Sequence, residues 1–232
     1  MESIPSCIDC LNRPKSIFRN LSTDEYDILT YKKSCILLKK GEIVYHENQR
    51  SNGCYCVHKG VIKLFKTGVD GKEQIIRFAQ KGEIIGFRSL LCNEVACTTA
   101  KVIEEATLCF IPAPTIFSLL KSNSSFSIEL MKFSCKELGE ANQYITDIAQ
   151  KTVRERLAEV LLLLKKSFDL DQEKTIQIAL TREEIANIVG TATESVIRLL
   201  SEFKQDKLIE LDGRKIRIID EKGLMKIEKA YD

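Results

Sequence analysis

Two pairs of side chains have the types and the spacing to do chemistry. Cys7 and Cys10 are separated by two residues in Cys7-Ile8-Asp9-Cys10, a spacing at which two thiols can share a metal or form a redox-active pair. Glu194 and Arg198 are four residues apart, so on a helix both would project from one face and could reach base edges in DNA. The sequence has no phosphate-binding loop, nucleophile elbow, metalloprotease helix or kinase motif, and we expect no enzyme.

The Glu194 and Arg198 pair needs a helix to carry it, and the chain predicts a pair of helices there. Thr181-Arg182-Glu183-Glu184 is a capping box that opens a helix through Val189, and Gly190 ends this helix. Thr191-Ala192-Thr193-Glu194 is a second capping box, which starts another helix after a very short turn. Two short helices with a glycine at the corner are typical of a helix-turn-helix.

The second of these helices divides into a buried face and an outward face. We expect the buried stripe to be Val196, Leu199, Leu200 and Phe203, and the outward side chains to be Thr193, Glu194, Ile197, Arg198 and Ser201. Residues 208–211 and 214–218 then form alternating runs on either side of Asp212-Gly213, a strong hairpin signal. The sequence therefore predicts a β-hairpin wing directly after the helix-turn-helix.

A long helix is expected upstream of these elements, over residues 124–150. Apolar or small residues recur there at alternating spacings of three and four, at Met131, Cys135, Leu138, Ala141 or Asn142, Ile145 and Ile148. This spacing favours a dimeric coiled-coil seam, although a helix packed on its own domain is the alternative. Residues 154–168 continue as a further helix, with Leu157, Val160, Leu161 and Leu164 on one face.

Short β-prone runs fill the N-terminal half. Seven of the 11 glycines lie between residues 41 and 86, where they separate the runs 43–45, 61–65 and 74–78, and Asp70-Gly71 marks a hairpin. A further run at 106–111 would close the domain before Pro112. The expected fold class is α+β: an N-terminal antiparallel β-barrel or jelly roll, a long dimerisation helix and a C-terminal winged helix-turn-helix.

Composition limits the class of protein further. The 232 residues are 44% hydrophobic and 29% charged, with no apolar run long enough to span a membrane and no signal-peptide pattern at the N-terminus, so we expect a cytoplasmic protein without membrane contact. In the cytosol the nine cysteines are not expected to form structural disulfides. The net charge is only +2, so any DNA contact must come from a local arrangement of cations.

The order of parts and several runs resemble the Crp/Fnr family of transcription regulators, named after the cyclic-AMP receptor and the fumarate-nitrate-reduction regulator. The resemblance extends over roughly residues 18–218 and is most specific in residues 180–190 and 194–200. It implies an N-terminal cysteine segment (1–20), a cyclic-nucleotide-binding-like sensor domain (21–122), a dimerisation helix (123–150) and a winged helix-turn-helix (151–232).

The resemblance also implies which residues contact DNA. Arg198 would pair with guanine and Glu194 would accept from cytosine, although Glu194 could instead be engaged in its capping box. Thr193 and Ile197 would help set the base preference. Phosphate contacts are expected from Thr181, Arg182, Thr191, Ser195 and the wing residues Arg214, Lys215 and Arg217. A homodimer formed through residues 124–150 would bind an inverted-repeat operator, with RNA polymerase as a further partner.

The expected effector pocket departs from that of cyclic-nucleotide-binding members. Its candidate residues are Gly86, Phe87, Arg88, Ser89, Cys97 and Thr98. Phe87 stands where those members have glutamate, Cys97 where they have the phosphate-binding arginine and Thr98 where they have serine. Arg88 is expected to point to the other face of a strand, so no cation is left for the phosphate, and we expect no cyclic-AMP binding.

The oxygen-sensing branch of the family carries an iron-sulfur cluster on cysteines, and this chain matches it in part. Cys7 and Cys10 resemble the first ligand pair and Cys109 the distant ligand, whereas Ser16 replaces the remaining N-terminal cysteine. If iron-sulfur or zinc binds, these three thiols are the candidates, with Cys54, Cys56 or Cys35 as a fourth; the alternatives are redox-active thiols or inert ones without a cofactor. His46 and His58 are expected to be surface or packing residues.

Three functions therefore compete. The preferred one is a DNA-binding transcription regulator controlled by a signal at the β-domain other than cyclic AMP. The second is a thiol-based or metal-based redox or oxygen sensor that acts through Cys7, Cys10 and Cys109. The third is a cyclic-nucleotide-binding module without a DNA role, which conflicts with the Arg198 helix and with the missing phosphate-binding arginine.

Overall fold

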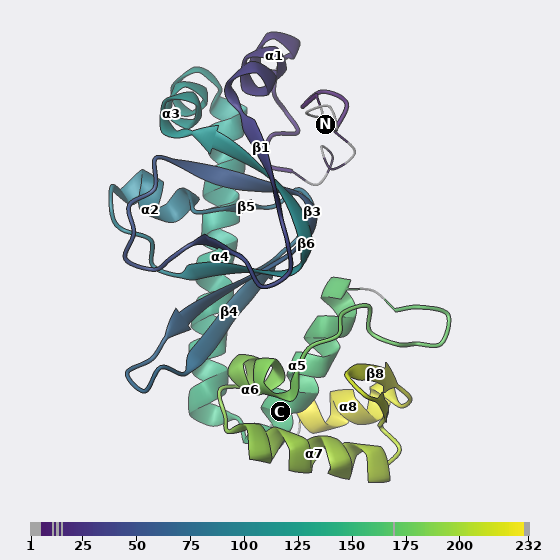
Figure 1. Ribbon diagram of the computed structural model, residues 1–232. Coiled ribbons are helices and arrows are strands. Elements are labelled where there is room, and N and C mark those ends of the chain that lie inside the picture. Colours follow the sequence, from purple (N-terminus) through teal and green to yellow (C-terminus); the bar gives the residue numbers. More distant parts are fainter. Residues whose placement is uncertain (1–5, 11, 13, 15, 169, 230–232) are drawn as a thin grey trace. The chain divides into compact units, whose positions relative to one another are not determined.

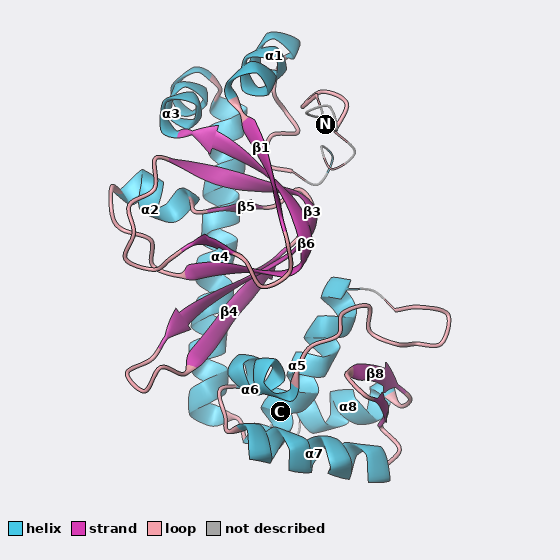
Figure 2. Ribbon diagram, in the orientation of Figure 1, coloured by secondary structure: helices cyan, strands magenta, loops and turns pink. Residues whose placement is uncertain are grey.

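A computed structural model describes residues 6–10, 12, 14, 16–168 and 170–229 (Figure 1). The chain forms two compact units: unit 1 comprises residues 1–68 and 75–139, and unit 2 comprises residues 69–74 and 140–232. Figure 2 shows that strands dominate unit 1 and helices dominate unit 2. The α+β fold class expected from the sequence is confirmed.

The sheet of unit 1 is antiparallel and has six strands. They are β1 (Ser34–Leu38), β2 (Ile43–Tyr45), β3 (Gly53–Thr67), β4 (Glu73–Ala79), β5 (Ile84–Ile85) and β6 (Thr99–Pro112). The hydrogen-bonded order is β1-β6-β3-β4, with β2 on β6 and β5 on β3. In the described part of the chain β1 and β4 are not paired with each other, so the barrel expectation is corrected to an open, jelly-roll-like sheet. All four predicted strand runs lie within strands, and Asp70-Gly71 lies in the turn between β3 and β4.

Three shorter helices accompany this sheet: α1 (Thr23–Lys32), α2 (Phe87–Cys92) and α3 (Ala113–Ser122). Ser22 opens α1 through a capping box with Glu25. Phe18 and Phe126 stack with ring centroids 5.3 Å apart, and the Tyr26 hydroxyl donates to the Phe18 carbonyl at 2.6 Å. These contacts fasten the segment before α1 to the core of unit 1.

The long helix α4 (Ser124–Gln150) has the bounds that the sequence predicts. Its first turns pack into unit 1 through Phe126 and Leu130, both buried. Along the rest of the helix a row of apolar side chains is exposed in the single chain, at Met131, Leu138, Ile145 and Ile148. Within the described residues, no helix is long and apolar enough to cross a membrane.

Unit 2 contains four further helices and a two-stranded sheet. The helices are α5 (Val153–Phe168), α6 (Arg182–Val189), α7 (Thr193–Gln205) and α8 (Glu221–Glu228), and the strands are β7 (Ile209–Asp212) and β8 (Lys215–Ile218). Leu157, Leu161 and Leu164 of α5 are buried as expected from their spacing. The α8 helix was not anticipated; it begins where the Asp220 side chain accepts from the Gly223 amide, and it buries Leu224.

Candidate nucleic-acid interface and thiol pocket

The helix pair α6–α7 is fixed by its ends. The Thr181 hydroxyl accepts from the Glu184 amide at 3.0 Å, and the Glu184 carboxylate accepts from the Thr181 amide at 2.8 Å, which confirms the first capping box. At the other end Gly190 has φ +71°, a conformation that a side chain would strain, so glycine stops the helix there. Arg156 Nε donates to the Val189 carbonyl at 3.0 Å and satisfies one of the last carbonyl groups.

The second capping box is not formed, and the prediction was wrong at this point. The N-cap of α7 is Ala192, which makes no side-chain capping bond. The reason lies in the preceding turn: the Thr191 amide donates back to the Ala186 carbonyl at 3.1 Å, so Thr191 still belongs to the end of α6. As a consequence, the Glu194 carboxylate is not engaged in closing the start of α7.

The two faces of α7 are those that the sequence predicts. Val196, Leu199, Leu200 and Phe203 are buried, whereas Glu194, Ile197, Arg198 and Ser201 are exposed and Thr193 and Ser195 are partly exposed. The Arg198 side chain is 67% exposed and forms an ion pair with Glu202 at 2.7 Å. An exposed pair of this kind contributes little to stability, so the guanidinium can exchange Glu202 for another acceptor.

Glu202 is itself held in place from a neighbouring helix. Arg154 of α5 contacts Glu202 at 2.9 Å and Asp206 at 2.7 Å, and its guanidinium lies 4.8 Å from the centre of the Phe203 ring. No local pattern in the sequence predicts this contact. Arg154 therefore connects the polar edge of α7 to its buried stripe.

The wing is the predicted hairpin, with Asp212 opposite Lys215 and Gly213 at φ +56° in the turn. Arg182 donates to the Gly213 carbonyl at 2.9 Å and so ties the turn to the start of α6; burial lowers the pKa of Arg182. Arg217 contacts Glu210 and Glu173 at 3.0 and 3.3 Å. Of the cations expected to contact phosphate, Arg214 and Lys215 are exposed, while Arg182 and Arg217 already contact groups of their own unit.

The expected effector residues lie mostly at α2. Gly86 is its N-cap, Phe87 and Ser89 are buried, and the Ser89 hydroxyl donates to the Gly86 carbonyl at 3.2 Å. Arg88 is exposed, but on a helix, so the strand expected at this position is corrected. Because the Phe87 ring packs against Phe133 of α4 at 5.5 Å between centroids, this position carries hydrophobic packing in place of a hydrogen-bonding carboxylate.

A partly buried cation that the sequence did not indicate, Arg77, lies in the same unit. Arg77 on β4 contacts Glu137 of α4 at 2.6 Å and Glu83 at 3.1 Å. Tyr45 interacts with Thr98 and with Cys97, and its burial raises its pKa to about 12. Arg77 is thus a cation inside unit 1 that is already matched by two carboxylates. The only local signal for Arg77 was its position in the strand run predicted over residues 74–78.

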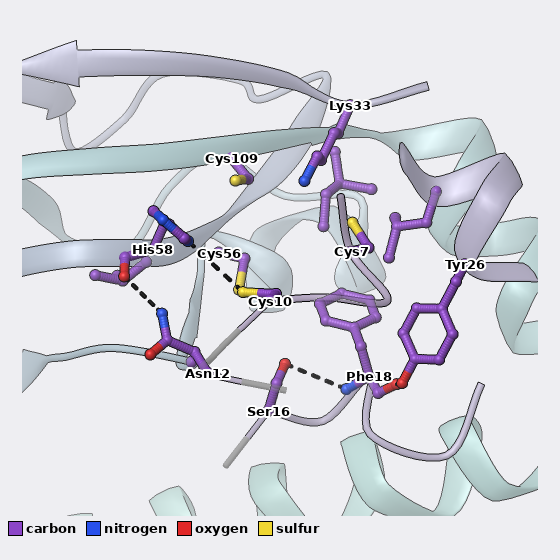
Figure 3. Close-up of a pocket in the computed structure, with 14 residues that line it drawn as sticks. Cys7, Cys10, Asn12, Ser16, Phe18, Tyr26, Lys33, Cys56, His58 and Cys109 are labelled. Atoms are coloured by element: carbon purple, nitrogen blue, oxygen red, sulfur yellow. Dashed lines mark hydrogen bonds between the residues drawn. The ribbon is translucent and has the colours of Figure 1, made fainter. Parts of the chain in front are cut away.

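The candidate metal ligands Cys7, Cys10 and Cys109 come together at one cavity of about 50 Å³ (Figure 3). Cys56, which the sequence left as one of three possible fourth ligands, lines the same cavity. The other residues that line it include Ser16, Lys33 and His58. We call this the thiol pocket. Segments of chain that are far apart in the sequence meet there: the N-terminal turn, the start of β1, β3 and β6.

Several contacts lie in the thiol pocket or directly beside it. Cys109 lies opposite Cys35 on one neighbouring strand and opposite Cys56 on the other, and the Cys35 and Cys109 sulfur atoms are 3.1 Å apart. Cys10 Sγ lies 3.6 Å from His58 Nδ1, so His58 packs against the pocket thiols, in line with the expected packing role. Burial raises the pKa of Cys109 and raises that of Cys56 to about 12. Among the described residues no three side chains are spaced to hold a metal ion as they stand.

Comparison with known proteins covers most of the chain. Residues 36–123 match the cyclic nucleotide-binding domain and residues 155–227 match the Crp-like helix-turn-helix domain. The transcriptional activator protein Anr of Pseudomonas protegens is 28% identical over 217 residues, which are 92% of this chain and 88% of Anr. The transcriptional activator protein FnrA of Stutzerimonas stutzeri is 29% identical over 189 residues, 81% of this chain and 77% of FnrA.

Solved structures agree with this match at the level of the fold. The structure of FixK2 from Bradyrhizobium japonicum superposes with a TM-score of 0.75 at 22% identity. The superposition covers 86% of this chain and 99% of FixK2. Both proteins therefore share the same order of structural parts: a β-rich domain, long helices and a helix-turn-helix domain.

Proposed function

Since the chain belongs to the Crp/Fnr family of transcription regulators and is a DNA-binding protein, not an enzyme, we propose how it recognises DNA and what kind of signal controls that recognition. It binds an inverted-repeat operator as a homodimer, and a signal other than cyclic AMP, received in unit 1, controls that binding. The compartment of action is the cytoplasm, where the operator and RNA polymerase are found.

The outward face of α7 is the observation that supports specific recognition. Arg198 is exposed, and DNA can replace Glu202 as the partner of its guanidinium, which suits bidentate contact with guanine. Glu194 has no capping role at the start of α7, so its carboxylate is available to accept from cytosine. Lys215 and Arg214 on the wing, with Thr191 and Ser195 beside the turn, would contact phosphates and set the register of the helix.

The exposed apolar row of α4 supports the homodimer. Met131, Leu138 and Ile145 lie seven residues apart, and each is more than 60% exposed in the single chain. A second copy of α4 would cover this row, as in a parallel coiled coil. Such a dimer places two α7 helices about 34–36 Å apart, one turn of DNA, and so reads an inverted repeat.

The end of α4 also has a direct contact with the helix-turn-helix. The Tyr144 hydroxyl donates to the Ile188 carbonyl at 3.3 Å, at the end of α6. A change in how the two α4 helices pair would therefore be transmitted to α6 and then to α7 through this bond. This supports control of DNA binding by the geometry of the dimer.

The signal is unlike cyclic AMP in chemistry. A cyclic phosphate needs cations or several N–H donors, yet Phe87 and Cys97 supply neither and Arg77 already contacts two carboxylates. The thiol pocket supports a redox or oxygen signal instead, because Cys7, Cys10 and Cys109 all line it. Thiolates suit zinc and iron-sulfur centres. The binding or loss of such a centre would change the conformation of the N-terminal turn.

DNA recognition is tested by selecting sites from a library of random duplexes with the purified full-length protein. We expect an inverted repeat whose half-sites are centred about one helical turn apart, with guanine and cytosine at conserved positions. Sedimentation of the free protein should give a dimer. Enrichment of a single half-site, or of no site, would contradict the proposal.

The signal is tested on protein purified without oxygen, by its absorption spectrum, its metal content and its affinity for the selected operator before and after exposure to air. Absorbance near 400 nm with bound iron, lost in air together with operator affinity, would support the oxygen sensor. A colourless, metal-free protein that binds the operator equally in both states would reject it. Calorimetry with cyclic AMP should show no binding at micromolar concentrations.

A further inference from the structure

Ser16 stands where the family resemblance would place a third N-terminal thiol, and its position identifies what could replace that thiol. Ser16 is only 5% exposed and lines the thiol pocket. Its hydroxyl accepts from the Phe18 amide at 3.3 Å, and Cys56 of β3 lines the same pocket. A thiol is therefore already present beside the position of the missing ligand, although it comes from the sheet and not from the N-terminal segment.

Cys56 differs in this respect from the two other cysteines that the sequence left open. Cys54, two residues earlier on the same strand, is fully buried in the hydrophobic core and does not line the pocket. Cys35 approaches Cys109 from β1, and it too is outside the lining. In the described part of the chain, Cys56 is thus the one of the three that faces the same cavity as Cys7 and Cys10.

The sheet holds Cys56 and Cys109 as a pair. They are directly opposite each other on β3 and β6, so their side chains project from the same face and their β-carbons are about 5 Å apart. Two sulfur ligands of one tetrahedral metal, each about 2.3 Å from the ion, lie about 3.8 Å apart, a separation that two side chains with β-carbons about 5 Å apart can reach. The register of the sheet therefore supplies half of a four-thiol site.

The N-terminal turn supplies the other half. The Cys10 amide donates to the Cys7 carbonyl at 3.4 Å, so both thiols lie at the ends of one tight turn above the sheet. Two cysteines separated by two residues are a frequent half of a tetrahedral site. Among the described residues no three donors are spaced to hold an ion as they stand, so a metal-bound form requires these thiols to come closer together.

The surroundings of the pocket suit a negatively charged centre. Four thiolates around a divalent ion carry a net charge of minus two, and Lys33 is a buried cation that lines the same pocket. His58, next to Cys10 Sγ, can hydrogen-bond to a sulfur ligand as an outer partner.

We propose that Cys7, Cys10, Cys56 and Cys109 together form a four-thiolate site for a thiophilic metal centre, with Cys56 in the place of the thiol that Ser16 lacks. The inference deepens the sensing role proposed above and rests on it. Zinc and an iron-sulfur cluster have the same donor chemistry, and the experiment separates them. Metal binding releases the thiol protons and connects the N-terminal turn to β3 and β6.

The experiment uses the full-length, reduced, metal-free protein under nitrogen and three matched chains: the parent, Cys56→Ala and Cys35→Ala. Each is titrated with Co²⁺, whose thiolate charge-transfer absorption reports the number of sulfur ligands, and then with Zn²⁺ in competition. The parent should bind one ion per chain with four thiolates. Cys56→Ala should lose one thiolate and bind roughly 100-fold more weakly or worse, since loss of an outer partner alone costs about 10–100-fold. Cys35→Ala should match the parent.

A rescue variant separates loss of a ligand from loss of the fold. In the double variant Ser16→Cys with Cys56→Ala, the returned N-terminal thiol should restore four-thiolate absorption. In a parallel sample, a mixture of ferrous and ferric iron with sulfide replaces Co²⁺, and absorbance near 400 nm with stoichiometric sulfide identifies a cluster, whereas its absence with tight zinc binding identifies a zinc site. Both results support the four-thiolate site.

Three results would overturn the proposal: no metal bound by the parent, full binding by Cys56→Ala, or loss of binding in Cys35→Ala. Operator affinity is measured on the same samples. If the parent binds its metal through Cys56 but its operator affinity does not change with the metal, the sensing role fails while the site stands. If DNA affinity follows the redox state but Cys56→Ala behaves as the parent, the sensing role stands while the proposed site fails.

Discussion

The helix-turn-helix and the thiol pocket assemble their chemistry in opposite ways. On α7 the residues proposed for DNA recognition, Glu194 and Arg198, lie about one turn apart, and they occupy a different face from Val196, Leu199 and Phe203, which hold the helix in place. In the thiol pocket the donors come from the N-terminal turn, β3 and β6, and Cys109 is also part of the buried core. Recognition and folding are therefore separable on α7 but combined in the pocket.

The largest effect is expected on the buried face of α7. Phe203 is fully buried, and Phe203→Ala should lower the free energy of unfolding of unit 2 by about 3–5 kcal/mol, through lost transfer energy and a cavity. Ile197→Ala, on the exposed face of the same helix, should change it by less than about 0.5 kcal/mol. Urea unfolding followed by circular dichroism measures both. Equal losses would contradict the separation of the two faces.

The thiol pocket should not show this separation. Cys109 is 7% exposed between two strands, so Cys109→Ser buries a hydroxyl and should lower the free energy of unfolding by about 1–3 kcal/mol even in the metal-free protein. Cys92→Ser changes an exposed thiol at the end of α2 and serves as the control, with less than about 0.5 kcal/mol expected. If metal-free Cys109→Ser were as stable as the parent, Cys109 would have no packing role.

The N-termini of α6 and α7 differ, because only α6 begins with a side-chain capping bond. The expected difference in stability between variants at these two positions is smaller. Thr181→Ala removes a formed capping bond and should cost about 1 kcal/mol of stability. Thr191→Ala should leave stability unchanged to within a few tenths of a kcal/mol, because Ala192 and not Thr191 is the N-cap of α7. Thermal melts of the two variants distinguish them. A similar loss in both would mean that the second capping box forms after all.

The wing should have the smallest effect on specificity. Lys215 is exposed at the hairpin, and Lys215→Ala should weaken binding to cognate and unrelated DNA alike, while the slope of log affinity against log salt falls by about one. Fluorescence anisotropy at several salt concentrations measures this slope. A selective loss for the cognate site would place Lys215 at a base and not at a phosphate.

The same difference between α7 and the thiol pocket explains which parts of the fold and of the candidate sites could be predicted from the sequence. On α4, α6, α7 and the wing, local signals such as capping residues, glycine and alternation act over a few residues, so the bounds of α4 and both faces of α7 were predicted. The failure at Thr191 was also local: a backbone bond to Ala186 extended the end of α6 by one residue, and no side-chain pattern reports that bond.

The thiol pocket could be predicted only in part. The spacing of Cys7 and Cys10 marked a pair, and the family resemblance indicated Cys109, but three cysteines remained equal candidates for a fourth donor. The choice of Cys56 depends on the register of β3 against β6, which pairs residues more than fifty positions apart in the sequence. Lys33 and His58 gave no local signal at all, because their role comes entirely from tertiary packing.

The central claim, that the outward face of α7 reads bases, is tested most directly by the affinity of the parent and of Arg198→Ala for the selected operator and for operators changed at the predicted guanine. Arg88→Ala, which changes an exposed arginine of unit 1, is the control. The account predicts that Arg198→Ala loses about 1–3 kcal/mol on the operator and binds all four bases at that position nearly equally. If Arg198→Ala kept the parent's affinity and its preference for guanine, α7 would not be the reading helix in the way described.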